Sequence, residues 1–180
     1  MGFSFDVCVP LVDNEAVFLE SGPLRESLQN LALAKAGSIA QDNEDALILG
    51  ADTVVVLGDA VLGKPKSSND AKEMIRLLSG NVHTVMTGVA LVCKKSGFEK
   101  KTYASTNVWF RNINEDESDD YIAKGDWQDK AGAYAIQGNA LVFIDKIDGC
   151  YYNVVGLPVK QTIECFAEFA DTVAKTKSMS

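Results

Sequence analysis

The stretch ALILGADTVVVL, from Ala46 to Leu57, decides the fold class, because it predicts a buried β-strand. Its residues are aliphatic or β-branched except at the Asp52-Thr53 step. The following Gly58-Asp59 pair is typical of a hairpin turn, which would lead into a second strand at Ala60–Leu62. A carboxylate is rarely left unpaired inside such an apolar strand. Asp52 is therefore the most informative single residue of the chain.

The sequence around Asp52 allows two interpretations of this residue and does not decide between them. It is either a structural residue, whose carboxylate is satisfied at a strand end or bulge, or a functional one. A functional carboxylate at this place would ligate a divalent cation or accept a proton from water.

The rest of the chain predicts strands and helices in mixed order. The pairs Ser67 with Asp70 and Asn114 with Glu117 are typical of helix N-termini, and Gly125 is typical of a helix C-terminus. Further strands are predicted over residues 1–12, 82–93, 102–111, 140–147 and 151–155, and further helices after Ser21 and from about Pro158. This order favours an α/β fold with a mixed β-sheet and packed helices over a doubly wound Rossmann unit. The glycine fingerprints of Rossmann and P-loop sites are absent from the sequence.

Charge and cysteine usage exclude several classes of protein. The 180 residues contain 17 Lys and Arg against 25 Asp and Glu, a net charge of −8, which argues against a surface for nucleic acid or anionic membrane. The apolar runs are too short to span a bilayer. The 4 cysteines have no metal-ligand spacing and no signal-peptide pattern opens the chain, so we expect a cytoplasmic protein with free thiols. A single histidine, His83, disfavours a His-based triad or zinc site.

Three lysines are candidates for binding an anion. Lys64 and Lys66 flank Pro65 after Gly63, and two ammonium groups on such a stiff loop suit a phosphate. A solvated basic turn is the alternative. Lys35 falls in line with the apolar stripe of its predicted helix, so it either extends its ammonium group to water or points into an anion site.

A loop rich in small residues provides the remaining candidates. Its two parts are Asp129-Lys130-Ala131-Gly132-Ala133-Tyr134 and Ile136-Gln137-Gly138. Gln137 offers a donor and an acceptor, as reading the edge of a nucleobase requires. The alternative is a tight structural loop in which Gln137 caps an element, and the residues alone do not decide.

Taken together, several ordered stretches resemble the Maf family of nucleotide pyrophosphatases over nearly the whole chain. The matching stretches are Leu31-Ala32 with Lys35-Ala36, residues 50–55 (GADTVV), 63–65 (GKP), 78–80 (LSG), 87–90 (TGVA), 129–134 (DKAGAY), 136–138 (IQG) and 151–158 (YYNVVGLP). The resemblance implies an elongated, two-lobed α/β fold with a central cleft, similar to inosine triphosphatases, and a homodimer. It implies hydrolysis of a nucleoside triphosphate to the monophosphate and pyrophosphate with a divalent cation, Mg²⁺ or Mn²⁺.

Roles for single residues also follow from the resemblance. Asp52 resembles the family's general base and metal ligand, and Lys35 and Lys64 resemble its phosphate-binding lysines. Lys130, Thr53 and Gln137 resemble substrate-binding residues, and Thr53 with Gln137 is similar to the branch that acts on dTTP and UTP. The branch that acts on 7-methyl-GTP tends to have Gln and Glu at those two places.

Two departures from the family pattern shape our expectations. Asn14 stands where the family commonly has Glu, so Glu15 is the candidate for the second metal ligand, with Asp13 beside it. The family's opening Ser-x-Ser-Pro-Arg-Arg strand and loop has no counterpart before Phe3. We therefore expect a Maf-like domain over residues 1–174, with a polar tail at 175–180, an unpaired sheet edge beside the strand of Asp52, and low or absent activity. A non-catalytic nucleotide-binding protein of the same fold is the alternative.

Overall fold

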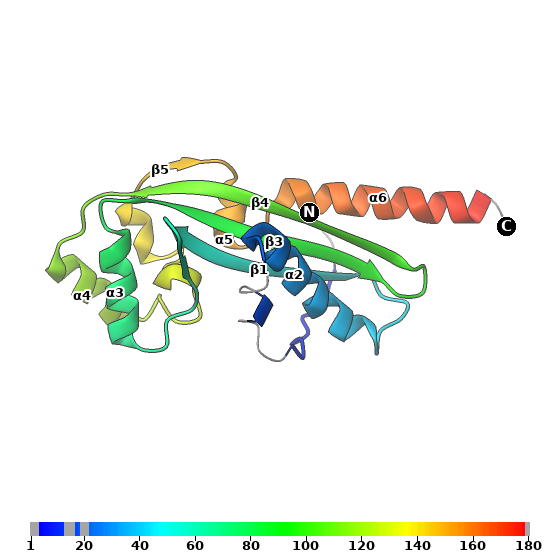
Figure 1. Cartoon of the computed structure of the whole chain (residues 1–180), viewed down its shortest axis with the longest axis horizontal. Coiled ribbons are helices and arrows are strands. Elements are labelled where there is room, and N and C mark those ends of the chain that lie inside the picture. The colour runs from blue at the N-terminus through cyan, green and yellow to red at the C-terminus, as the bar shows by residue number, and fades with distance from the viewer. Residues whose placement is uncertain (1–3, 13–16, 19–21, 179–180) are drawn as a thin grey trace. The chain divides into compact units, whose positions relative to one another are not determined.

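The computed structural model describes residues 4–12, 17–18 and 22–178 (Figure 1). A five-stranded sheet has the order β2-β1-β3-β4-β5. Its strands are β1 (Ile48–Leu57), β2 (Ala60–Leu62), β3 (Val82–Cys93), β4 (Phe98–Phe110) and β5 (Ile144–Asp148). The helices are α2 (Leu24–Ala40), α3 (Ser68–Leu78), α4 (Glu115–Lys124), α5 (Tyr151–Val155) and α6 (Val159–Ser178), with 3₁₀ turns η1 (Ala131–Ala133) and η2 (Asn139–Phe143). The predicted α/β fold of a sheet with packed helices is confirmed.

The chain divides into two compact units. Unit 1 comprises residues 1–52, 88–102 and 160–180, and unit 2 comprises residues 53–87 and 103–159. The strands β1, β3 and β4 each contribute residues to both units. No helix in the described ranges combines the length and apolar character needed to cross a bilayer.

Unit 1 is built around the close approach of α2 to the sheet. A Cβ atom at Gly50 of β1 would lie 2.4 Å from the carbonyl oxygen of Ala32, and one at Gly88 of β3 would lie 2.3 Å from the carbonyl oxygen of Leu28. Only glycine permits such contact between a strand and a helix backbone. On α6, Phe169 makes an edge-to-face contact with Phe98 of β4 at a centroid distance of 5.2 Å.

Unit 2 contains the larger apolar core, to which the inner faces of the strands and the helices α3 and α4 contribute. Its buried members include Val55, Ile75, Val108 and Tyr121. The predicted caps of the helices are confirmed: Ser67 Oγ accepts from the Asp70 amide, and Asn114 and Glu117 form a reciprocal capping box. Gly125 ends α4 in the left-handed conformation at φ 79°. The predicted hairpin is also present, with Val55 opposite Leu62 and Leu57 opposite Ala60.

Three predicted strands are wrong or displaced. Residues 4–12 have no regular structure, and residues 139–143 form a 3₁₀ turn before a strand that begins at Ile144. Residues 151–155 are helical, because a helical turn buries Asn153 completely while Tyr151 and Tyr152 stay exposed. Short apolar runs do not distinguish a buried strand from a helical turn by periodicity. The predicted cap at Ser21 lies outside the described residues.

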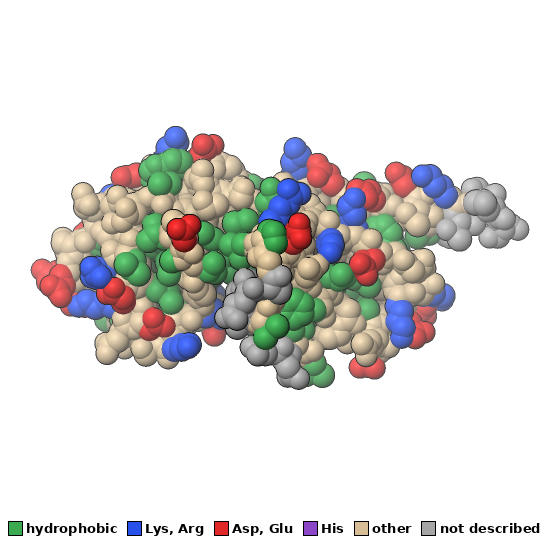
Figure 2. All heavy atoms as spheres, in the orientation of Figure 1, with side chains coloured by type: hydrophobic (Ala, Val, Ile, Leu, Met, Phe, Trp, Pro, Cys, Tyr) green, Lys and Arg blue, Asp and Glu red, His purple; other side chains and the backbone are tan. Residues whose placement is uncertain are grey.

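Charged side chains are mixed on the surface drawn in Figure 2. Cationic and anionic groups alternate over this face instead of gathering by sign. Some charged side chains of the described residues form ion pairs within one unit, such as Lys100 with Glu168 at 2.8 Å and Arg111 with Glu117 at 2.7 Å.

Candidate active site

Asp52 of β1 and Lys35 of α2 form an ion pair within unit 1. Lys35 Nζ donates to Asp52 Oδ1 at 2.5 Å, and the two side chains are 14% and 16% exposed. The contact follows from Gly50, because the absence of a Cβ there brings α2 onto β1 near Ala32, less than one helical turn before Lys35. The structure therefore joins two residues that were predicted separately, a carboxylate in an apolar strand and a lysine in line with an apolar helical stripe.

Thr53, the next residue of β1, belongs to unit 2 and makes a different set of contacts. Its hydroxyl lies 2.9 Å from the hydroxyl of Thr87 on β3, and either group can donate. A Cβ at Gly156, which ends α5, would lie 4.0 Å from Thr53 Oγ1. Successive residues of a strand point to opposite faces. Asp52 and Thr53 are thus adjacent along the chain, while each has its own partner.

Lys64 lies on a loop that is tied to the predicted small-residue loop. The amide of Gly132 donates to the carbonyl of Gly63 at 2.9 Å, which connects the residue before Lys64 to the turn η1. Gly132 has a φ of 65°, and a Cβ there would lie 2.8 Å from Val55 Cγ2 of β1. A glycine is therefore required both by the backbone conformation and by packing. This connection was not predicted from the sequence, since no local pattern indicates a hydrogen bond between residues so far apart.

The segment from Lys130 to Gln137 is fixed from several sides within unit 2. The Tyr134 hydroxyl lies 2.8 Å from His83 Nε2, and Tyr121 donates to the carbonyl of Ala133 at 3.0 Å. Burial raises the pKa of Tyr134, and burial lowers the pKa of His83 from 6.5 to about 4. His83 is therefore a neutral, hydrogen-bonded core residue at neutral pH.

The far end of this segment is held by Asp126. Its carboxylate accepts from the backbone amide of Asn139 at 2.9 Å and from the Asn139 side chain at 2.7 Å, and both hydrogen bonds lower the pKa of Asp126. Asp129 and Ala133 adopt left-handed backbone conformations, at φ 58° and 62°. Non-glycine residues persist in such conformations where the surroundings enforce them, often at functional sites.

Three of the predicted substrate-binding side chains in unit 2 are accessible to a ligand. Lys64, Lys130 and Gln137 are exposed, and no ion pair to either lysine occurs in the described ranges. Fixed backbones that carry accessible cationic and amide groups suit the binding of a polar, anionic ligand. The structure thus fixes the backbones from which these side chains project.

A metal site has one described candidate ligand, Asp52. The described residues contain no cluster of three His, Cys, Asp or Glu side chains that could hold a metal. Glu15, the second predicted ligand, lies outside the described residues, as do Asp13 and Asn14. Mg²⁺ is commonly held by one or two carboxylates, with phosphate oxygens and waters as the other ligands. The carboxylate chemistry of Asp52 therefore fits a divalent cation that binds together with a phosphate.

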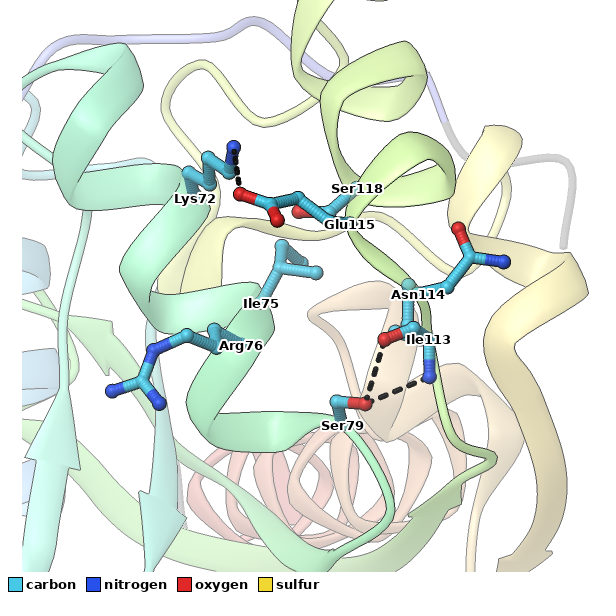
Figure 3. A pocket seen from close by; sticks show the side chains of 8 residues that line it. All are labelled: Lys72, Ile75, Arg76, Ser79, Ile113, Asn114, Glu115 and Ser118. Atoms are coloured by element: carbon cyan, nitrogen blue, oxygen red, sulfur yellow. Dashed lines mark hydrogen bonds and ion pairs between the residues drawn. The ribbon is translucent and has the colours of Figure 1, made fainter.

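A pocket of about 200 Å³ lies between α3 and α4 in unit 2 (Figure 3). Lys72 at its rim pairs with Asp119 at 2.5 Å and with Glu115 at 3.4 Å, and Ser79 accepts from the backbone amide of Ile113 at 2.7 Å. None of the site residues predicted from the sequence lines it. Because Lys72 is already paired, this pocket is a poorer candidate for an anion site than the loops of Lys64 and Lys130.

Comparison with known proteins identifies the family of this chain. The family described as Maf-like protein matches residues 1–169. The chain is 45% identical over 159 residues to a protein from Clostridium botulinum (strain Eklund 17B / Type B) named dTTP/UTP pyrophosphatase, covering 88% of this chain and 84% of the relative. Proteins of the same name from Alkaliphilus metalliredigens (strain QYMF) and Bacillus cereus (strain B4264) are 45% and 41% identical, over 86% and 92% of this chain and 80% and 84% of their own. A family match over most of the chain, with relatives this similar over most of their length, shows that the chain belongs to the Maf-like protein family.

Proposed function

We propose that this protein hydrolyses dTTP and UTP to the nucleoside monophosphate and pyrophosphate. The observation that carries the proposal is the ion pair of Asp52 and Lys35, which puts a candidate base and a candidate phosphate ligand side by side at 2.5 Å. The names of the relatives support the same substrates. A role in removing unwanted nucleotides from the cytoplasm, and action on modified pyrimidine nucleotides, are further parts of this proposal.

The reaction requires a base, charge neutralisation and a good leaving group. Asp52 accepts a proton from a water molecule whose oxygen attacks the α-phosphorus. The bond from the α-phosphorus to the bridging oxygen breaks, and pyrophosphate leaves with the electron pair. Lys35 and Lys64 bind phosphate oxygens and offset the negative charge that develops there.

Lys35 has two partners in this scheme. In the structure its ammonium group donates to Asp52. A bound triphosphate offers that ammonium group a more highly charged acceptor, so we expect Lys35 to turn from Asp52 to the phosphate when substrate binds. The carboxylate of Asp52 is then available to the attacking water.

A divalent cation, Mg²⁺ or Mn²⁺, belongs to the proposal as cofactor. Asp52 and Glu15 are its proposed protein ligands. When bound, the cation would neutralise phosphate charge and polarise the phosphorus–oxygen bonds.

Thr53, Gln137 and Lys130 are the proposed determinants of substrate choice. The side-chain amide of Gln137 can both donate to and accept from a pyrimidine edge. The Thr53 hydroxyl is oriented by Thr87 at 2.9 Å, so it presents a defined hydrogen-bonding direction. We further propose that the protein acts in the cytoplasm and forms a homodimer.

The test is pyrophosphate release from a panel of nucleotides, with Mg²⁺ and with Mn²⁺, by the wild type and by Asp52→Asn. We expect turnover of dTTP and UTP by the wild type and a loss of about 10²- to 10⁴-fold in Asp52→Asn. Equal rates in the two proteins would exclude Asp52 as the base. Turnover of 7-methyl-GTP alone would overturn the substrate class, and calorimetric binding of UTP without turnover would identify a non-catalytic nucleotide-binding protein.

A further inference from the structure

The pocket between α3 and α4 is lined by a buried polar group for which the fold supplies no partner. Two serines contribute to its lining (Figure 3). The hydroxyl of Ser79 accepts from the backbone amide of Ile113 at 2.7 Å. Ser118 is only 6% exposed and, among the residues that the structure describes, its hydroxyl has no hydrogen-bond partner. Because an unpartnered buried hydroxyl costs free energy, Ser118 favours a ligand that bonds to it.

The remaining lining of the pocket is largely apolar. Ile75 and Ile113 supply aliphatic side chains, and Lys72 and Arg76 add the methylene stems of their long side chains. A ligand with polar atoms along its whole edge would leave several of them unsatisfied against these groups. The lining therefore suits a molecule that is apolar except for one hydrogen-bonding group at the end that meets Ser118.

The charges at the rim of the pocket indicate that this ligand is neutral. Lys72 pairs with Asp119 at 2.5 Å and with Glu115 at 3.4 Å. Arg76 pairs with Glu73 at 2.6 Å. An anionic or cationic ligand would have to displace one of these ion pairs, or leave its own charge unpaired beside apolar side chains.

The volume of the pocket limits the size of the ligand. It holds about 200 Å³, and an apolar cavity of about 150 Å³ accommodates benzene. A serine hydroxyl turns between staggered positions about χ1, so it can meet a polar group of a molecule seated in the pocket. One ring with one small polar substituent, as in phenol, fits both the volume and the lining.

Both helices that form the pocket are bonded to loops with candidate ligand-binding residues. The amide of Lys66 donates to the carboxylate of Asp70 in the first turn of α3 at 2.8 Å, which ties the loop of Lys64 to this helix. Tyr121 of α4 donates to the carbonyl of Ala133 in the small-residue loop at 3.0 Å. All of these residues belong to unit 2. A ligand that holds α3 against α4 therefore also holds the two loops.

We propose that the pocket between α3 and α4 is an effector site for a small neutral ring compound with a single hydroxyl group, which bonds to Ser118. The effect on nucleotide binding rests on the proposed function. The pocket is present without a ligand, so a molecule that fills it stabilises the existing packing of the two helices. Because both loops are then pre-organised, the effector lowers the dissociation constant of the nucleotide.

The first test is binding of phenol to the full chain without nucleotide, followed by nuclear magnetic resonance of the backbone amides. We expect a dissociation constant on the order of 1 mM, with the largest shifts in α3 and α4. Benzoate and uracil are rings of similar size that carry a charge or a polar edge, and both should bind more weakly. Absence of phenol binding at these helices, or binding of benzoate or uracil as tight as that of phenol, would overturn the proposal.

The second test measures the bond to Ser118 by comparing phenol with toluene, which has a methyl group in place of the hydroxyl. In Ser118→Ala the preference for phenol over toluene should fall about three- to tenfold. This variant removes an unpartnered hydroxyl, so it should fold as the wild type does. The matched control is Ser105→Ala, which changes an exposed serine of β4 outside the pocket and should keep the preference. An equal preference in the wild type and Ser118→Ala would exclude the bond.

The third test is the dissociation constant of dTTP, measured by calorimetry on Asp52→Asn to avoid hydrolysis. Saturating phenol should lower this constant about threefold, and by less when Ser118→Ala is added. A constant that phenol leaves unchanged would overturn the effector role. Failure to bind dTTP or turn it over without phenol would count against the proposed function instead, because the phenol titration needs no nucleotide.

Discussion

The backbone amide of Gly132 donates to the carbonyl of Gly63 at 2.9 Å, so the loop of Lys64 and the segment from Lys130 to Gln137 are one connected structure. A Cβ at Gly132 would lie 2.8 Å from Val55 Cγ2 of β1, the strand that also carries Asp52. This backbone hydrogen bond and the packing of Gly132 on Val55 therefore help to set the positions from which the proposed ligand-binding groups of unit 2 project.

Replacing Gly132 by alanine should be strongly destabilising. The φ of 65° is unfavourable for a residue with a Cβ, and that Cβ would lie 2.8 Å from Val55. The conformational cost and the overpacking together predict a loss of about 3 kcal/mol in the free energy of unfolding. Gly58→Ala is the matched control, because Gly58 has a φ of 58° and a Cβ there would meet no atom within 4 Å, so it should lose only about 1 kcal/mol. Urea unfolding of the two variants measures the difference, and equal losses would contradict the packing argument.

Gly50→Ala should separate Lys35 from Asp52. The added Cβ would lie 2.4 Å from the Ala32 carbonyl oxygen, so α2 must move away from β1, at a cost of about 1–3 kcal/mol. Gly37→Ala is the control on the same helix: it meets no atom within 4 Å and should raise stability by about 0.5–1 kcal/mol. We expect the pyrophosphatase rate to fall in Gly50→Ala and to stay at the wild-type value in Gly37→Ala. A rate that is unchanged in Gly50→Ala would show that the ion pair does not matter for turnover.

The ion pair predicts a non-additive pair of substitutions. Lys35→Met leaves the largely buried Asp52 carboxylate without its lysine partner and should cost about 1–3 kcal/mol of stability. Adding Asp52→Asn to that variant removes the negative charge that has lost its lysine, so the double variant should be more stable than Lys35→Met alone. Urea unfolding of the four proteins of the cycle gives the coupling free energy. Additive losses would mean that the two side chains act independently.

His83 predicts a pH dependence of stability. Burial lowers its folded-state pKa from 6.5 to about 4, so the unfolded chain binds the proton first as the pH falls. The contribution of His83 to the free energy of unfolding is therefore fully present above pH 6.5. It falls by about 3 kcal/mol in total between about pH 6.5 and 4. Carboxylates whose pKa is lowered in the folded protein, such as Asp126, also lose their contribution to the free energy of unfolding as the pH falls through their folded-state pKa. His83→Gln isolates the histidine contribution: its stability should fall less than that of the wild type across this range, and parallel curves would refute the assignment.

Local patterns in the sequence predicted much of the fold. The β-branched run at residues 46–57, the Gly58-Asp59 turn and the caps at Ser67 and Asn114 specify structure through neighbours a few residues apart, and the structure has all of them. The segments 139–143 and 151–155 were wrongly predicted, because their conformation depends on distant groups. Asp126 holds Asn139 at 2.9 Å, and Asn153 donates across to the carbonyl of Val85 at 3.0 Å.

In the candidate site, too, local sequence specified some features and distant contacts specified others. The sequence alone determined which residue types are available for chemistry, with Asp52 in an apolar strand, lysines on a helix and a loop, and Gln137 among small residues. Only the tertiary structure decided that Lys35 meets Asp52, that Thr53 meets Thr87 and that Gly63 is bonded to Gly132. The physical reason is that these contacts depend on how closely two backbones can approach. That distance is set by the absence of a Cβ at Gly50 and Gly132, whose consequence appears only when the opposing element is in place.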